Sequence, residues 1–171
     1  MKKVKIILTT LVLLLALAGC QNKSTTSSEY LISGADSATI LNAFNTNGIV
    51  YFYIQGSKLG DAGLKELTEL SNEYKVKVYA VNLLNTNFLK SSTDTNVQAM
   101  YTKMGDKAKF LDDGITLTTP YVFEIENGEI KNTVQGISAK DLNADNLTDD
   151  NLKDIKDSYK SMFEAQSALN K

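Results

Sequence analysis

Apolar residues follow two different periods along this chain, and together these periods predict alternating strands and helices. The continuous apolar and aromatic run at Ile49–Gln55 is typical of a central strand that is covered on both faces. Asp61–Tyr74 instead has the period of an amphipathic helix, with its leucines directed inward and its glutamates, Glu66 among them, directed outward. The two segments lie next to each other along the chain, as a strand and its following helix do in α/β proteins.

The remaining segments complete an α/β layout. Strands are also predicted at 29–33 and 75–83, and helices at Asp36 or Ser37 to about 47, at Thr93 or Asp94 to Met104, and at Asp149–Leu169. Asn127-Gly128 separates two apolar stretches, and its tolerance of positive φ predicts a β-hairpin over 121–134. We therefore expect one α/β sandwich domain, 29–171, with a central mixed sheet, helices on both faces and a C-terminal hairpin plus helix.

The N-terminal segment has the pattern of a secretory signal. Three lysines precede the apolar run Ile6–Leu17, which is shorter than the roughly 20 residues that span a bilayer. The run ends in Leu17-Ala18-Gly19-Cys20, which resembles the bacterial lipoprotein signal, or lipobox. This resemblance implies that 1–19 is removed, that Cys20 carries a diacylglycerol, and that 20–28 is a flexible tether. The expected location is the extracytoplasmic face of the cell membrane.

Composition excludes several classes of function. Cleavage before Cys20 leaves 15 of the 18 lysines against 20 acidic residues, a net charge of −5, which is unfavourable for nucleic-acid binding. The chain has no histidine, and Cys20 is its only cysteine, so we expect no imidazole base, no His-ligated metal and no cofactor. The acidic stretches at 112–113 and 141–150 lack the spacing of a calcium-binding loop, and we interpret them as solvated turns and helix starts.

Several stretches resemble the thioredoxin-like superfamily in order and spacing. Val50–Tyr74 is similar to the segment that runs from the central strand through the active-site turn into the next helix. Thr119–Phe123, followed by Asn127-Gly128, is similar to the family's cis-proline strand and hairpin, and Gly136 lies where the family has a glycine. Pro120 is the chain's only proline, and the sequence leaves the isomer of its preceding bond open.

The chain departs from this family at the residues that carry out its chemistry. Where thioredoxins have a tryptophan and Cys-x-x-Cys, this chain has Gly56 and then Ser57-Lys58-Leu59-Gly60. Tyr51 stands at the position of the family's buried aspartate. Thiol–disulfide exchange requires a thiolate, so we predict a redox-inactive domain with no catalytic residues.

The family's substrate groove does not depend on its cysteines. The resemblance implies a shallow groove that pairs with an extended polypeptide. Its expected lining is Gly56, Ser57, Lys58, Leu59, Thr119, Pro120 and Tyr121. We therefore expect a partner protein or peptide of the envelope or secreted class. Among lipid-anchored relatives, the chain looks most like accessory proteins of bacteriocin and peptide export in Gram-positive bacteria.

Three other interpretations remain open at this point. Ser57 and Lys58 could be the nucleophile and base of a hydrolase, although a helix cap and a solvated lysine are simpler roles. The domain could be a redox partner that uses cysteines in trans, or an immunity-type blocker of a membrane toxin. The connection 82–119, longer than is usual in thioredoxins, could add partner contacts, but the i, i+4 spacing of Met100 and Met104 favours packing on the sheet.

Overall fold

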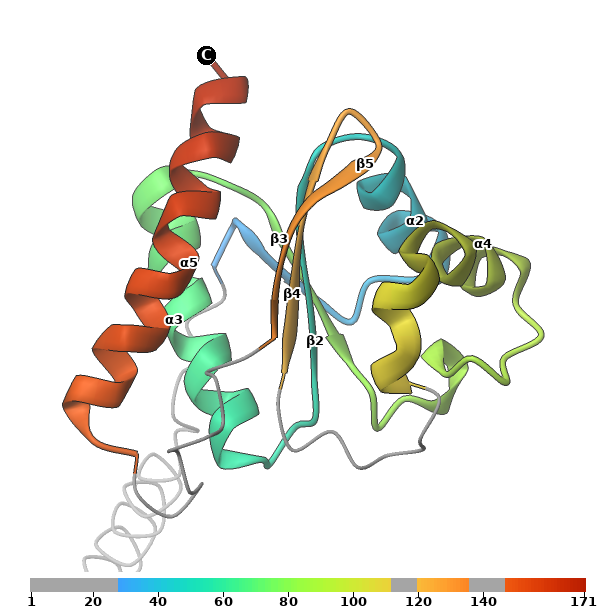
Figure 1. Ribbon diagram of the computed structural model, residues 1–171, viewed down its shortest axis with the longest axis horizontal. Coiled ribbons are helices and arrows are strands. Elements are labelled where there is room, and N and C mark those ends of the chain that lie inside the picture. The colour runs from blue at the N-terminus through green and yellow to red at the C-terminus, as the bar shows by residue number, and fades with distance from the viewer. Residues whose placement is uncertain (1–27, 112–119, 136–146) are drawn as a thin grey trace, which may run out of the picture.

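The computed structural model describes residues 28–111, 120–135 and 147–171, and these form one α/β sandwich (Figure 1). The strands are β1 (Leu31–Ser33), β2 (Gly48–Tyr53), β3 (Val78–Asn82), β4 (Tyr121–Glu126) and β5 (Glu129–Gln135). The α-helices are α2 (Ser37–Asn45), α3 (Lys58–Tyr74), α4 (Thr95–Met104) and α5 (Asp149–Leu169), with 3₁₀ segments at Thr86–Phe88 and Gly105–Leu111.

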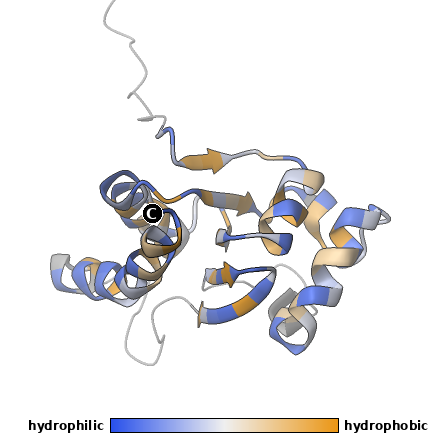
Figure 2. Ribbon diagram, turned by 90° about the horizontal axis from the view of Figure 1, so that it is seen from above, coloured by the Kyte–Doolittle hydropathy of each residue, from blue (hydrophilic) through white to orange (hydrophobic). Residues whose placement is uncertain are grey.

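The sheet has the strand order β1-β3-β2-β4-β5. β1, β3 and β2 are parallel, whereas β4 runs antiparallel to β2 and β5 antiparallel to β4. Helices α3 and α5 cover one face, and α2 and α4 cover the other (Figures 1 and 2). This arrangement confirms the predicted fold class, a mixed sheet with helices on both faces and a C-terminal hairpin plus helix, and it is consistent with a thioredoxin-like fold.

β2 lies at the centre of the molecule, and all six of its residues are buried, as its continuous apolar run predicts. Because successive side chains of a strand point to opposite faces, β2 contributes to both cores. Val50 and Phe52 pack with Phe44 and Phe123 on the face of α2 and α4. Ile49, Tyr51 and Tyr53 pack with Tyr159 and Phe163 on the face of α3 and α5. Figure 2 shows the apolar residues gathered on the strands and on the inward sides of the helices.

Local capping signals set the starts of three helices. Asp36 and Asp94 cap α2 and α4, where their carboxylates accept hydrogen bonds from the backbone N–H groups of the first turn. α3 begins at Lys58, three residues earlier than predicted, because the Ser57 hydroxyl caps it. At its other end, Lys75 adopts a left-handed conformation as the C-cap, and the β3 pairing therefore starts at Val78 and not at 75.

One orientation predicted for α3 is wrong. Glu66, expected on the solvent side, is only 5% exposed. α5 packs along α3 (Figure 1) and covers a side of the helix that would face water in a single helical layer. Burial raises the pKa of the Glu66 carboxyl, and nearby Lys156 and Lys65 act in the opposite direction.

The described part of the long connection packs against the sheet. Met100 and Met104 are buried in the core beside α2, which confirms the packing role predicted from their spacing. The Tyr101 hydroxyl donates to the Phe88 carbonyl at 2.9 Å and ties α4 to the preceding 3₁₀ segment.

The structure tests only part of the sequence predictions. Those for Cys20, Thr119 and Gly136, and for the acids at 112–113, fall outside the described residues. Within the described residues, no helix combines the length and the apolar character needed to cross a bilayer.

Candidate functional site

The turn between β2 and α3 is held in place by its own hydrogen bonds. The Ser57 N–H donates to the Ile54 carbonyl at 3.1 Å, and the Gly56 N–H donates to Asp61 Oδ1 at 3.2 Å. Gly56 has a φ of +86°, a conformation that a side chain would strain. These bonds stabilise the turn, and the exposed Gly56 adds no side chain to its outer surface.

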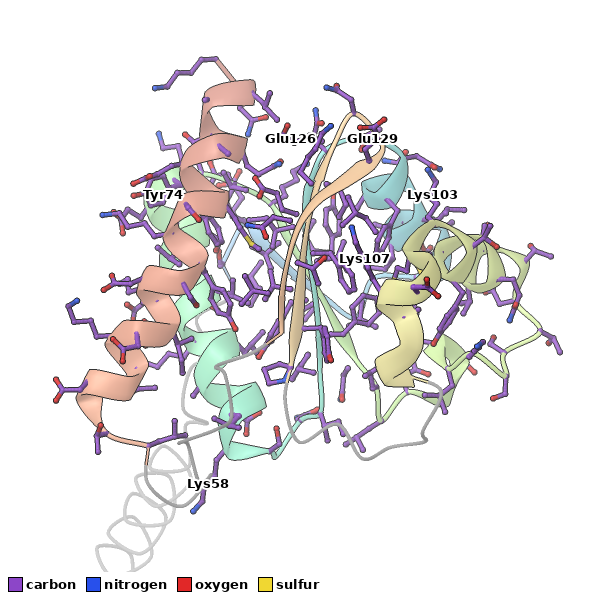
Figure 3. All side chains as sticks on the ribbon, viewed as in Figure 1. Lys58, Tyr74, Lys103, Lys107, Glu126 and Glu129 are labelled. Atoms are coloured by element: carbon purple, nitrogen blue, oxygen red, sulfur yellow. The ribbon has the colours of Figure 1, made fainter. Side chains whose placement is uncertain are left out.

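The Ser57 hydroxyl is used as a helix cap. Ser57 Oγ accepts a hydrogen bond from the Gly60 N–H at 2.9 Å. A Cβ atom at Gly60 would lie 2.6 Å from Ser57 Oγ and 2.7 Å from the Ile54 carbonyl oxygen, so only glycine allows this close approach. Lys58, the first residue of α3, is exposed and extends away from the body of the protein (Figure 3).

The start of β4 lies at the same end of the central strands as this turn. Phe52, near the end of β2, pairs with Tyr121, the first residue of β4. Since the two strands are antiparallel, Pro120, which precedes Tyr121, lies next to the end of β2, close to where the turn begins. Tyr121 is half-buried, and burial raises its pKa.

The structure describes six of the seven residues predicted to line the groove, and two of them, Leu59 and Pro120, are buried. Gly56 and Lys58 are exposed and Ser57 and Tyr121 are half-buried, while Pro120 is buried at the strand edge. The Leu59 side chain is only 4% exposed, because the first turn of α3 directs it inward. Its predicted place in the lining is therefore wrong. The seventh residue, Thr119, is not among the described residues.

A buried tyrosine of β2 donates a hydrogen bond to the first turn of α3. The Tyr51 hydroxyl donates to the Gly60 carbonyl at 2.8 Å, and its ring stacks on Tyr53 with 5.3 Å between centroids. A Cβ atom at Gly63 would collide with the Tyr51 hydroxyl, so the glycine makes room for it. Burial raises the pKa of Tyr51 strongly, which keeps the phenol protonated as a donor. The sequence placed Tyr51 correctly in the strand, but only the fold shows its bond to α3.

A polar link that the sequence did not reveal joins the turn to the end of β3. Asn82 Nδ2 donates to Gln55 Oε1 at 3.0 Å, and Asn82 Oδ1 accepts from the backbone N–H groups of Gln55 and Leu84, each at 3.2 Å. The only signal available in the sequence is that both side chains lie at the carboxyl ends of predicted strands, where ligands of parallel sheets bind.

The site contains no group suited to redox or metal chemistry within the described residues. No thiol is present there, and these residues hold no group of three or more metal-ligating side chains. The arrangement instead presents the exposed Gly56 and Lys58 and the half-buried Tyr121 at one end of the central strands. Such a surface is suited to contact with another polypeptide.

Comparison with known proteins does not place this chain. No protein-family model matches it, and no curated protein matches it at a significant level.

Proposed function

We propose that this chain is a lipid-anchored protein of the extracytoplasmic membrane face, whose thioredoxin-like domain binds a protein or peptide and catalyses no thiol–disulfide exchange. The binding surface is formed by Gly56, Ser57 and Lys58 of the turn together with Pro120 and Tyr121 of β4. An accessory role in secretion or peptide export is the finer form of this proposal.

The observation that carries the proposal is that the Ser57 hydroxyl caps helix α3, at a site where the described residues include no thiol. Its hydroxyl accepts from the Gly60 N–H at 2.9 Å, and Gly60 stands where the second cysteine of the motif would be. The turn and the start of β4 nevertheless lie at the same end of the central strands. In this arrangement a helix cap stands in place of a thiol, but the surface formed by the turn and the start of β4 is still present. Such a surface can bind a polypeptide without thiol–disulfide exchange.

The anchoring part of the proposal is supported by the sequence. Leu17-Ala18-Gly19-Cys20 follows a charged start and a short apolar run, and Gln21–Glu29 is polar, without apolar anchors. A tether of this composition gives the domain access to partners near the membrane surface.

Site-specific photocrosslinking in the native cell tests the binding surface. Photoreactive residues are placed at Lys58 and Tyr121, with a control probe at Lys153, an exposed residue of α5. Lys58 is preferred to Ser57, because replacing Ser57 would remove the cap of α3. We expect one discrete adduct from Lys58 and Tyr121 and none from Lys153. Equal labelling from all three positions, or no adduct from any of them, would overturn the proposed surface.

A further inference from the structure

A cleft with a volume of about 920 Å³ lies between the edge strand β1 and helix α3. It is lined by Ser28, Leu31, Ser33, Gly34, Tyr53, Gln55, Asp61, Leu64, Lys65, Thr68, Glu69, Asn82 and Asn85. From Asp61 to Glu69, α3 rises about 12 Å along it, which corresponds to three or four residues of extended chain. The size is within the usual range of ligand sites.

One end of the cleft lies outside the carboxyl ends of all three parallel strands. Ser33 ends β1, Gln55 follows β2, and Asn82 ends β3. The chain leaves β2 toward α3 on one face and leaves β3 toward α4 on the other, so the strand order reverses between these neighbours. Crevices at such a reversal are where open α/β sheets bind ligands.

β1 presents unpaired backbone groups beside this cleft. The Tyr30 carbonyl accepts from the Val78 N–H at 2.8 Å, and Leu31 lies opposite Val78 in the parallel register. In this register Tyr30 and Ile32 bond to β3, so Leu31 and Ser33 direct their backbone groups to the open side. The Leu31 N–H is taken by Ser28 Oγ at 3.2 Å. The Leu31 carbonyl and both backbone groups of Ser33 therefore face the open edge (Figure 2, outermost strand).

Two lysines bond to backbone carbonyls at the other edge of the sheet, beside β5. Lys107 Nζ donates to the Ile130 carbonyl of β5 at 3.5 Å, and Lys103 Nζ donates to the Gly128 carbonyl at 3.4 Å (Figure 3). Lysines at an edge are a common means of preventing unwanted strand pairing.

We propose that the cleft binds an extended polypeptide that adds to β1 as a further strand. The main chain of the peptide pairs with Ser33 and the Leu31 carbonyl, and an apolar side chain enters the cleft between Leu31 and Leu64. Gln55 is placed to bond the peptide main chain, since its Nε2 donates to no other described residue. This site is separate from the surface of Lys58 and Tyr121, and neither depends on the other.

The length of the cleft and the balanced charge of its lining favour a short peptide with little net charge. The charged lining residues are Asp61, Lys65 and Glu69, and Glu69 is paired with Lys156 at 2.8 Å. Asp61 Oδ1 already accepts from the Gly56 N–H, and Lys65 is a lining residue of opposite charge. A second copy of this chain is disfavoured, because a strand of three residues offers far less contact than the roughly 1,200–2,000 Å² of a stable interface.

Peptide selection on the full lipid-anchored chain in phospholipid vesicles tests the site. A phage-displayed library of random dodecapeptides supplies the probes, and affinities of synthetic versions are measured by fluorescence anisotropy. Ser33→Pro removes the outward N–H and spares the ladder to β3, since proline is tolerated on edge strands. Ser33→Ala is the matched control that keeps this N–H. Thr68→Trp fills the cleft from α3 and leaves the sheet unchanged.

We expect selected peptides that lose at least tenfold in affinity with Ser33→Pro and with Thr68→Trp, and less than twofold with Ser33→Ala. Thermal unfolding of each variant separates lost binding from lost folding, and Thr68→Trp decides the matter where Ser33→Pro is unstable. Equal affinities across the variants, or no enriched peptide, would overturn the proposal. So would binding only to an array of glycans, or a concentration-dependent dimer that Ser33→Pro abolishes.

Discussion

At the scale of single residues, the polar groups inside the core are the most informative. Glu124 lies in the middle of β4 and is 5% exposed, and its Oε1 has no hydrogen-bond partner among the described residues. Burial raises the pKa of this carboxyl, and the neighbouring charge of Glu126 adds to the effect, while the Gln166 amide opposes it. A buried acid without full pairing costs stability when it is ionised.

Glu124 makes stability fall as pH rises. Because the folded-state pKa lies above the unfolded value, stability from this group is greatest below the unfolded pKa and is lost as pH rises through the folded pKa. We predict that Glu124→Gln raises the free energy of unfolding by about 1 kcal/mol at pH 7.5 and has little effect at pH 4. Urea denaturation at both pH values measures this. Glu73→Gln, at an exposed position of α3, is the control, and an equal gain from both variants would contradict the prediction.

At the scale of elements, the first turn of α3 combines a structural and a candidate functional role. Its cap, Ser57, bonds to Gly60, and Gly60 in turn accepts from the Tyr51 hydroxyl of β2. The helix start is therefore fixed both from within and from the neighbouring strand. This coupling explains why the helix starts at Lys58, well before the apolar period becomes clear in the sequence.

Substitution of Ser57 distinguishes a role as helix cap from a role as catalytic nucleophile. We predict that Ser57→Ala lowers the free energy of unfolding by about 1 kcal/mol, whereas Ser57→Asp, which also caps helices, retains most of the stability. Crosslinking from Lys58 should be the same in Ser57→Asp as in the unchanged protein. Thermal unfolding and adduct yield are the measurements. If Ser57→Asp folds normally but abolishes a cellular activity of the protein, the hydrolase alternative is favoured over a binding role.

At the scale of the whole molecule, the proposed anchor determines where the domain acts. Our prediction is that Cys20→Ser moves the protein from the membrane fraction to the medium or to a soluble fraction, because the diacylglycerol has no attachment point. The domain itself should stay folded, since Cys20 is the only cysteine and no disulfide can be lost. Fractionation with detection of the domain, together with a labelled fatty acid, checks this. Replacing Ser27 by alanine is the control in the tether. Retention of Cys20→Ser in the membrane would show that another element anchors the protein.

Local signals in the sequence determined most of the secondary structure. Asp36 and Asp94, each one of two predicted candidates, cap their helices. Asn127 and Gly128 form the hairpin turn, and Ile49–Tyr53 is the buried central strand. These features depend on neighbouring residues alone, through side-chain bonds to adjacent N–H groups, tolerance of positive φ and hydrophobic period. The absence of cysteine from Ser57-Lys58-Leu59-Gly60 is equally a property of the sequence.

Only the tertiary structure decided how these elements are covered and where surfaces remain open. Glu66 is buried because α5, almost 90 residues later in the chain, packs along α3. Leu59 points inward because the cap on Ser57 starts the helix early. The cleft beside β1 exists because residues distant in sequence, Leu31 and Asn82 among them, meet at one sheet edge. Such contacts depend on packing between elements, and no local pattern of residues encodes them.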